Sequence, residues 1–92
     1  MTIKMKHTNF LQNVEFAAET VNKVVQGLTK TSNELRREAY ISTCISADKE
    51  CFEIKVNGLT IREVNQVAIS VTLSSAVHID NNTFLINVII NN

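Results

Sequence analysis

The longest regular pattern in this chain is an alternation of apolar and polar residues between positions 67 and 79. Side chains at the odd positions are apolar, with Ser75 as the exception, and those at the even positions are small or polar. The apolar members are Val67, Ile69, Val71, Leu73, Val77 and Ile79. Because successive side chains of a strand point to opposite faces, this pattern predicts one long, half-buried β-strand.

A second strand is predicted to return after a turn over residues 80–83, which are rich in Asp and Asn and therefore adopt turn conformations readily. Residues 84–90 then alternate again. The expected cross-strand pairs are Ile79 with Phe84, Val77 with Ile86, Ser75 with Val88, and Leu73 with Ile90. Because these pairs place apolar side chains together on one face, residues 67–91 are predicted to be the largest core element.

The N-terminal third of the chain has a helical pattern. Apolar residues recur in steps of three and four at Leu11, Val14, Ala18, Val21, Val25 and Leu28, with Phe10, Ala17 and Val24 on the flanks. This spacing predicts an amphipathic helix that packs on an apolar surface along its whole length. Asn9 is the expected N-cap, with Gln12 at the capping-box position. Ahead of it, Ile3 and Met5 alternate with polar residues, which permits a short edge strand.

The end of this helix has two interpretations. The apolar seam continues in phase, at Ser32, Leu35 and Ala39, which favours one long helix. Gly27 and the polar run over residues 29–33 favour a break instead, and Thr31 with Glu34 forms a second capping box. We favour the break, with a short helix over residues 32–39, on the strength of the capping residues.

Two more strands are predicted, over residues 40–46, which are β-branched and aromatic, and over residues 51–56, which alternate apolar with charged. Asn57-Gly58 follows and is the strongest short hairpin signal. However, Thr60 and Glu63 form a capping box, flanked by the apolar pair Leu59 and Val64, which is typical of a helix start and predicts a helix over residues 61–66. We favour the hairpin and keep the helix as the alternative.

These elements predict an α+β fold in a single domain spanning residues 1–92: a long N-terminal amphipathic helix packed on one face of an antiparallel meander sheet of four to five strands. The last strand, however, also carries Leu85 and Ile89 on the face opposite to Phe84. The short second helix, a second copy of the chain or a partner protein must cover them. We therefore identify Leu85, Asn87 and Ile89 as a candidate interface.

Composition narrows the classes of function. The chain is 45% apolar and 20% charged with a net charge of zero, which is typical of a globular protein and provides no basic excess for duplex DNA. It has no Pro or Trp and many Asn, Ile and Lys, as expected from an AT-rich genome of a low-GC bacterium or its phages. Neither a signal-peptide pattern nor a membrane-length apolar run occurs, so we expect a cytoplasmic protein with Cys44 and Cys51 reduced.

The main basic cluster consists of Arg36, Arg37 and Lys30. These residues are candidate contacts for single-stranded nucleic acid, which few charges and some stacking can hold. Glu34 and Glu38 balance the cluster, and the chain is poor in aromatic residues, so a solvated helix face is the preferred interpretation.

Two arrangements of residues could in principle support other chemistry. His78 and Asp80 lie two positions apart on a predicted strand, so an imidazole oriented by a carboxylate is a candidate base for a small hydrolase. Cys44 and Cys51 with His7 or His78 could surround zinc, but no ligand spacing of a zinc site supports this. We expect no catalytic residue, metal or cofactor.

The preferred hypothesis is a non-enzymatic protein-binding module, acting as a small homo-oligomer in the role of inhibitor, adaptor or chaperone-like escort. It rests on the missing catalytic pattern and on the apolar surface that one helix leaves uncovered. A phage or mobile-element accessory protein that inhibits a host protein fits the size and composition. The alternatives are a single-stranded nucleic-acid-binding protein and a small hydrolase around His78.

Overall fold

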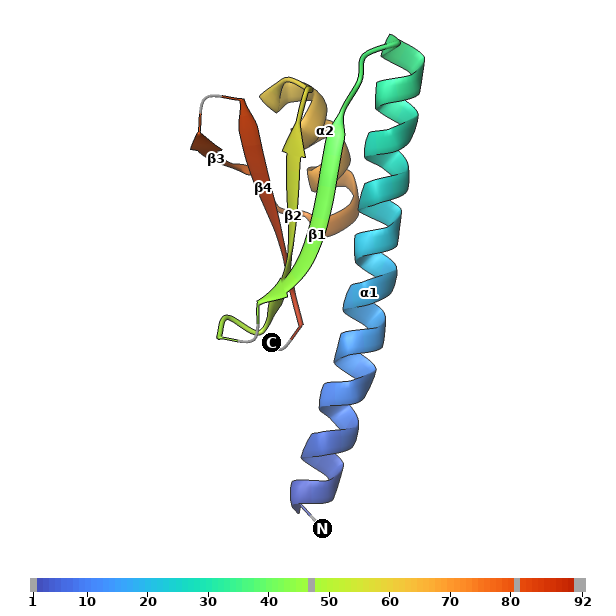
Figure 1. Cartoon of the computed structure of the whole chain (residues 1–92). Coiled ribbons are helices and arrows are strands. Elements are labelled where there is room, and N and C mark those ends of the chain that lie inside the picture. The colour runs from blue at the N-terminus through green and yellow to red at the C-terminus, as the bar shows by residue number, and fades with distance from the viewer. Residues whose placement is uncertain (1, 47, 81, 91–92) are drawn as a thin grey trace.

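The computed structural model describes residues 2–46, 48–80 and 82–90, with side chains from residue 11 onward. Its helices are α1 (Thr2–Leu35) and α2 (Ile61–Thr72), and its strands are β1 (Tyr40–Ser46), β2 (Cys51–Asn57), β3 (Val77–Asp80) and β4 (Thr83–Ile89). The strands form one antiparallel sheet in the order β1-β2-β4-β3, with α1 packed against it (Figure 1). The predicted α+β class, with a long helix on an antiparallel sheet of four strands, is confirmed.

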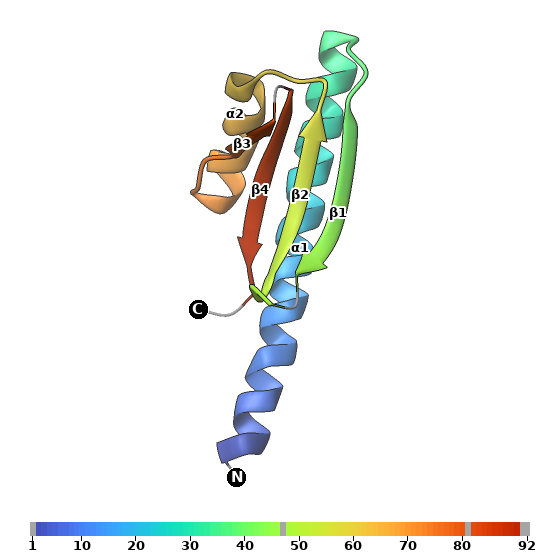
Figure 2. The same cartoon turned by 60° about the vertical axis from the view of Figure 1, so that its left-hand side comes forward.

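Both helices lie on the same face of the sheet, as Figures 1 and 2 show. The core fills the space between them, and its most deeply buried large side chains are Val24, Leu28, Ile54, Val56, Val64 and Ile86. The 34 residues of α1 span about 51 Å, whereas a seven-residue strand spans about 24 Å. The first turns of α1 therefore project past the sheet, so the predicted packing along the whole length of this helix is wrong, and the molecule is 52 Å long but only 24 by 19 Å across.

The start of α1 differs from the prediction. The helix begins at Thr2, so the N-cap at Asn9 and the edge strand at Ile3 and Met5 are wrong. A few alternating residues carry little information, because they also fit a helix start. The buried positions of α1 are Ala17, Val21, Val24 and Leu28. The apolar seam is thus rotated toward its predicted flank, since α1 packs against α2 as well as against the sheet.

The end of α1 is unbroken, so the predicted break and the separate helix over residues 32–39 are wrong. The hydroxyl of Thr31, expected to cap a second helix, instead donates to the carbonyl oxygen of Gly27 at 2.9 Å. Continuing a helix adds a hydrogen bond for each residue fixed, whereas a new helix requires a costly nucleus. The long-helix interpretation is therefore the right one.

The hairpin at Asn57-Gly58 is wrong, and the alternative helix after Thr60 is right, although it is longer than expected. Thr60 Oγ1 accepts a hydrogen bond from the backbone N–H of Glu63 at 3.2 Å, and Glu63 Oε1 accepts one from the N–H of Thr60 at 2.8 Å. Gly58 has a φ of 104° and packs directly on the backbone of Glu38. Its conformational freedom therefore serves the bend that leads into α2.

The long strand predicted over residues 67–79 is also wrong, because α2 and β3 share this stretch. Val67 and Val71, assigned to one face of a strand, are also one helical turn apart. Together with the buried Val64 and Ala68 they form the face of α2 that packs on the core. The periods of strand and helix coincide at positions four residues apart, so the alternation alone did not distinguish them.

β3 therefore begins only at Val77, and the predicted register fails. Val77 lies opposite Leu85 and His78 opposite Phe84, with an irregularity before Asp80. The order of a simple meander is lost too, because α2 separates β2 from β3 and β4 pairs with both of them. The predicted core-facing side chains of the last strand are nevertheless the buried ones, namely Phe84, Ile86, Val88 and Ile90.

The two helices approach each other most closely at Gly27. A Cβ atom placed on Gly27 would lie only 2.8 Å from Cγ1 of Val67 in α2. Valine is branched at Cβ and has few rotamers, so its methyl group cannot turn aside at low cost. Gly27 thus permits close packing of α1 on α2 and does not break the helix.

We expect Gly27→Ala to lower the free energy of unfolding by up to about 2 kcal/mol, because overpacking costs about 1–3 kcal/mol and the helix propensity of alanine returns roughly 1 kcal/mol of it. In a Val67→Ala background the same substitution should be neutral or stabilising. Urea unfolding of the four proteins in this cycle measures the coupling. Equal effects of Gly27→Ala in both backgrounds would contradict the close approach.

Candidate protein-interaction surface

The face of the sheet turned away from both helices, here called the open face, carries an apolar strip formed by Val77, Leu85 and Ile89. Val77 and Leu85 are cross-strand partners, and Ile89 lies four residues further along β4. Val77 is 53% exposed and Ile89 55% exposed, while Leu85 is half-buried. Since both helices occupy the other face, neither covers this strip (Figures 1 and 2).

Polar side chains border the apolar strip on its β2 side. Lys55 pairs with Leu85, and Glu53 pairs with the exposed Asn87. All three predicted interface residues therefore lie on the open face, as the alternation along the last strand predicted. The second helix, one of the proposed covers, lies on the opposite face and cannot act as one.

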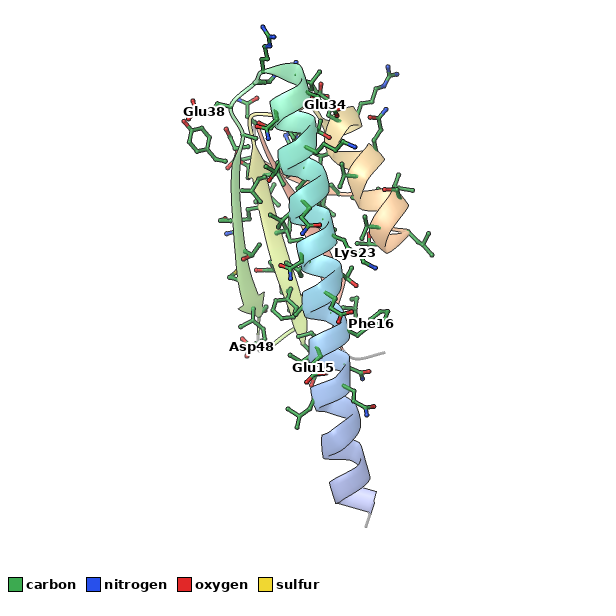
Figure 3. The ribbon with its side chains drawn as sticks, turned by 90° about the vertical axis from the view of Figure 1, so that its right-hand side faces the viewer. Glu15, Phe16, Lys23, Glu34, Glu38 and Asp48 are labelled. Atoms are coloured by element: carbon green, nitrogen blue, oxygen red, sulfur yellow. The ribbon has the colours of Figure 1, made fainter. Side chains whose placement is uncertain are left out.

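The end of β4 also lines a groove of about 420 Å³ where α1, the end of α2 and β4 meet. Its lining includes Asn87 and Ile89 from the predicted interface, together with Phe16 of α1. Phe16 is 73% exposed and projects from α1 on the side away from β1 (Figure 3). Phe16 was not predicted to be part of a surface, although its position outside the predicted apolar seam indicated that it would face solvent.

Leu73 is another exposed apolar residue, although it was predicted to face the core. It ends α2 in the left-handed conformation, with a φ of 63°, and its N–H donates to the carbonyl oxygen of Ile69 at 3.0 Å. Its side chain is 87% exposed. Glycine is the usual residue at such a position because a Cβ atom is unfavourable there.

The basic cluster has a structural role. Arg36 adopts a left-handed φ of 53°, and the N–H of Arg37 donates to the carbonyl oxygen of Ser32 at 3.0 Å, which closes the C-terminus of α1. Arg37 Nη1 lies 2.6 Å from Glu63 Oε1, so its charge is paired. Positive charge is favourable at a helix C-terminus. Lys30 is exposed on α1, and the three residues do not form one unpaired basic patch.

His78 and Asp80 are not brought together for catalysis. The ring of His78 lies 5.2 Å from that of Phe84, centroid to centroid, tilted by 31°. Asp80 Oδ1 accepts a hydrogen bond from the N–H of Asn82 at 3.4 Å, and the strand irregularity separates the two residues. In the part of the chain that the structure describes, no hydrogen bond or ion pair joins them.

The cysteines are free thiols, with Cys44 exposed and Cys51 buried. Burial raises the pKa of the Cys51 thiol, so it stays protonated at neutral pH. Its Sγ lies 3.9 Å from Oδ1 of Asn87, a weak contact. Over residues 11–46, 48–80 and 82–90 no three His, Cys, Asp or Glu side chains gather as metal ligands would, and the side chain of His7 lies outside this range.

No helix within the described residues has the length and apolar character needed to cross a membrane. Comparisons of the chain with protein-family models, with curated proteins and with solved structures found no match.

Glu63 links the end of α1 to the start of α2, and the ionised form of its carboxyl group is favoured. The hydrogen bond from the backbone N–H of Thr60 is the main reason that its pKa lies below the ordinary glutamate value, and the Arg37 guanidinium lowers it further. A carboxyl with a lowered pKa in the native state stabilises the fold above its unfolded-state pKa. That contribution is lost as the pH falls through its native pKa.

We therefore expect Glu63→Gln, which keeps an amide at the capping-box position but removes the charge, to unfold at a lower temperature than the wild type near neutral pH. The difference should shrink as the pH falls below about 4, where the unfolded chain binds the proton. Thermal unfolding followed by circular dichroism at several pH values measures this. Glu19→Gln on the exposed face of α1 is the control, and a difference that stays constant into acid would contradict the role of the charge.

Proposed function

We propose that this chain is a non-enzymatic protein-binding module that docks on another protein as an inhibitor, adaptor or chaperone-like escort, and that it acts as a small homo-oligomer. The observation that carries the proposal is that β4 has apolar side chains on both faces, while both helices pack on only one of them. Folding explains Phe84, Ile86 and Val88, but it leaves Leu85 and Ile89 without a role.

The apolar strip has the properties of a docking site for protein. Each large apolar side chain contributes on the order of 1.5–3 kcal/mol when it goes from full exposure to full burial, so half-exposed Val77 and Ile89 retain a considerable part of that energy for a partner. Lys55 and Glu53 beside the strip supply the polar rim that surrounds the apolar centre of protein interfaces. Phe16 and the groove beside Ile89 extend the same surface.

Size and composition support a placement among the accessory proteins of phages or mobile elements, which act on a host protein. The other two functions find less support. The pairing of Arg37 with Glu63 weakens the case for single-stranded nucleic acid, and the separation of His78 from Asp80 weakens the case for a hydrolase.

We expect Ile89→Lys to abolish capture of the partner while the fold persists, because a charge placed in an apolar interface is costly to desolvate. The measurement is affinity capture from the native host or from its phage-infected cells, with mass spectrometry, and circular dichroism checks the fold. Ile69→Lys is the matched control, since Ile69 is 47% exposed but lies on α2, away from the open face.

Capture that is equally strong with Ile89→Lys and with the wild type would rule out the apolar strip as the docking site. Oligonucleotide binding that weakens with salt and is lost in Arg36→Ala would instead favour the nucleic-acid function, because neutralised phosphates release counterions.

A further inference from the structure

The two edges of the sheet differ in how well they are protected against pairing with another strand. β3 is four residues long, contains an irregularity and ends in Asp80, all of which discourage pairing. β1 is seven residues long, pairs with β2 without a bulge, and its sequence YISTCIS contains neither a charged residue nor proline. An edge strand of this kind is a template for pairing with a further strand.

The flank of α1 beside β1 carries an apolar seam. Thr29 and Ser32 line a pocket together with Ile41 of β1, so this side of the helix faces β1. By helical spacing the same side carries Leu11, Val14, Ala18 and Val25. Leu11 is 51% exposed and the other three are half-buried. This is the outer half of the apolar seam, which the core leaves partly uncovered.

Figure 3 shows β1 next to α1, with α2 on the opposite side of the helix. On β1 itself, Ile45 points toward the helix layer and is 57% exposed. The β1 edge and the outer seam of α1 thus form one surface, here called the β1 flank.

We propose that a second copy of this chain binds the β1 flank, with its β1 antiparallel to the first about a two-fold axis, so that the two sheets become one. This dimer would be the homo-oligomer of the proposed function, and the inference depends on the proposed function only in that respect. A two-fold axis requires a surface that is complementary to itself. β1 meets that requirement without repulsion between like charges, because none of its seven residues is charged.

The register follows from the pattern of side chains. Paired residues of antiparallel strands share a face, so odd positions must meet odd positions and even must meet even. Pairing Thr43 with Thr43 of the second copy uses all seven residues of β1. On the helix side, Ile41 of each copy then lies opposite Ile45 of the other. On the open face, Ser42 of each copy lies opposite Cys44 of the other. The exposed Ile45 is then covered by an apolar neighbour.

The helices fit the same axis. α1 runs antiparallel to β1 (Figure 1), and Ile41 is level with Thr29 and Ser32. Two strand residues span about 7 Å, or four to five helical residues, which puts Val25 level with Thr43. The two α1 helices would therefore meet near Val25. Ala18, the next seam residue toward the N-terminus, is small and permits close approach of the helices.

The first test is sedimentation equilibrium of the full chain over a range of micromolar concentrations. We expect the wild type to sediment as a dimer and Ile45→Lys to weaken the dimer roughly tenfold or more, because lysine on an edge strand opposes pairing. Ile79→Lys, the same substitution on the other edge strand, is the matched control and should leave the dimer intact. A wild type that is monomeric throughout, or equal effects of the two substitutions, would overturn the proposal.

The second test checks the register by disulfide formation. In the proposed pairing a cysteine at position 42 lies directly opposite the native Cys44 of the second copy, with Cα atoms about 4.5–5.5 Å apart, within the range of a disulfide. Two copies of Cys44 are diagonal neighbours about 7–8 Å apart and do not react readily.

Ser42→Cys should therefore give a covalent dimer on mild oxidation, with a 42-to-44 link identified by mass spectrometry, and further replacement of Cys44 by serine should remove it. A wild type that cross-links as well as Ser42→Cys, or a link between two copies of position 42, would overturn the register. A monomer that still captures a partner through Ile89 would refute this interface and the homo-oligomer, but not docking on another protein. A dimer that captures nothing would refute the docking function alone.

Discussion

The constraint on which this fold depends is that two helices share one face of a narrow sheet. The buried side chains of β2 and β4 lie on the helix side of the sheet, and both α1 and α2 must pack against them. They can do so only by packing closely, which the missing side chain of Gly27 permits beside Val67. The capping box of Thr60 and Glu63, together with the ion pair to Arg37, then fixes where one helix ends and the other begins.

An element could be predicted from the sequence where apolar spacing, residue propensity and turn or capping residues all indicated the same structure. The helical periodicity of α1, the strands β1 and β2 and the buried row of β4 are of this kind, and the alternation along β4 also placed Leu85 and Ile89 on the open face. Residues 61–76 could not be assigned correctly, because apolar positions four apart fit helix and strand equally well. There the decisive signal was local, namely the capping box, which the Asn57-Gly58 pair obscured.

The surfaces that remain uncovered lie on different parts of the molecule. The apolar strip follows β3 and β4, whereas the β1 flank lies at the other edge of the sheet. A two-fold axis through β1, perpendicular to the sheet, would keep both open faces on the same side of a dimer. Such a dimer would present two docking sites to one partner surface, and the second contact would then form at a high effective concentration.

Leu73 occupies a helix end at which glycine would be the more stable residue. A left-handed residue with a Cβ atom costs about 1–2 kcal/mol, comparable to a whole helix cap, and glycine would avoid that cost. Burial does not compensate, since the side chain is 87% exposed. Natural proteins tend to violate local rules at positions that serve function. The turn after α2 is thus a place where the chain forgoes intrinsic stability and holds a large apolar group in water at a fixed orientation.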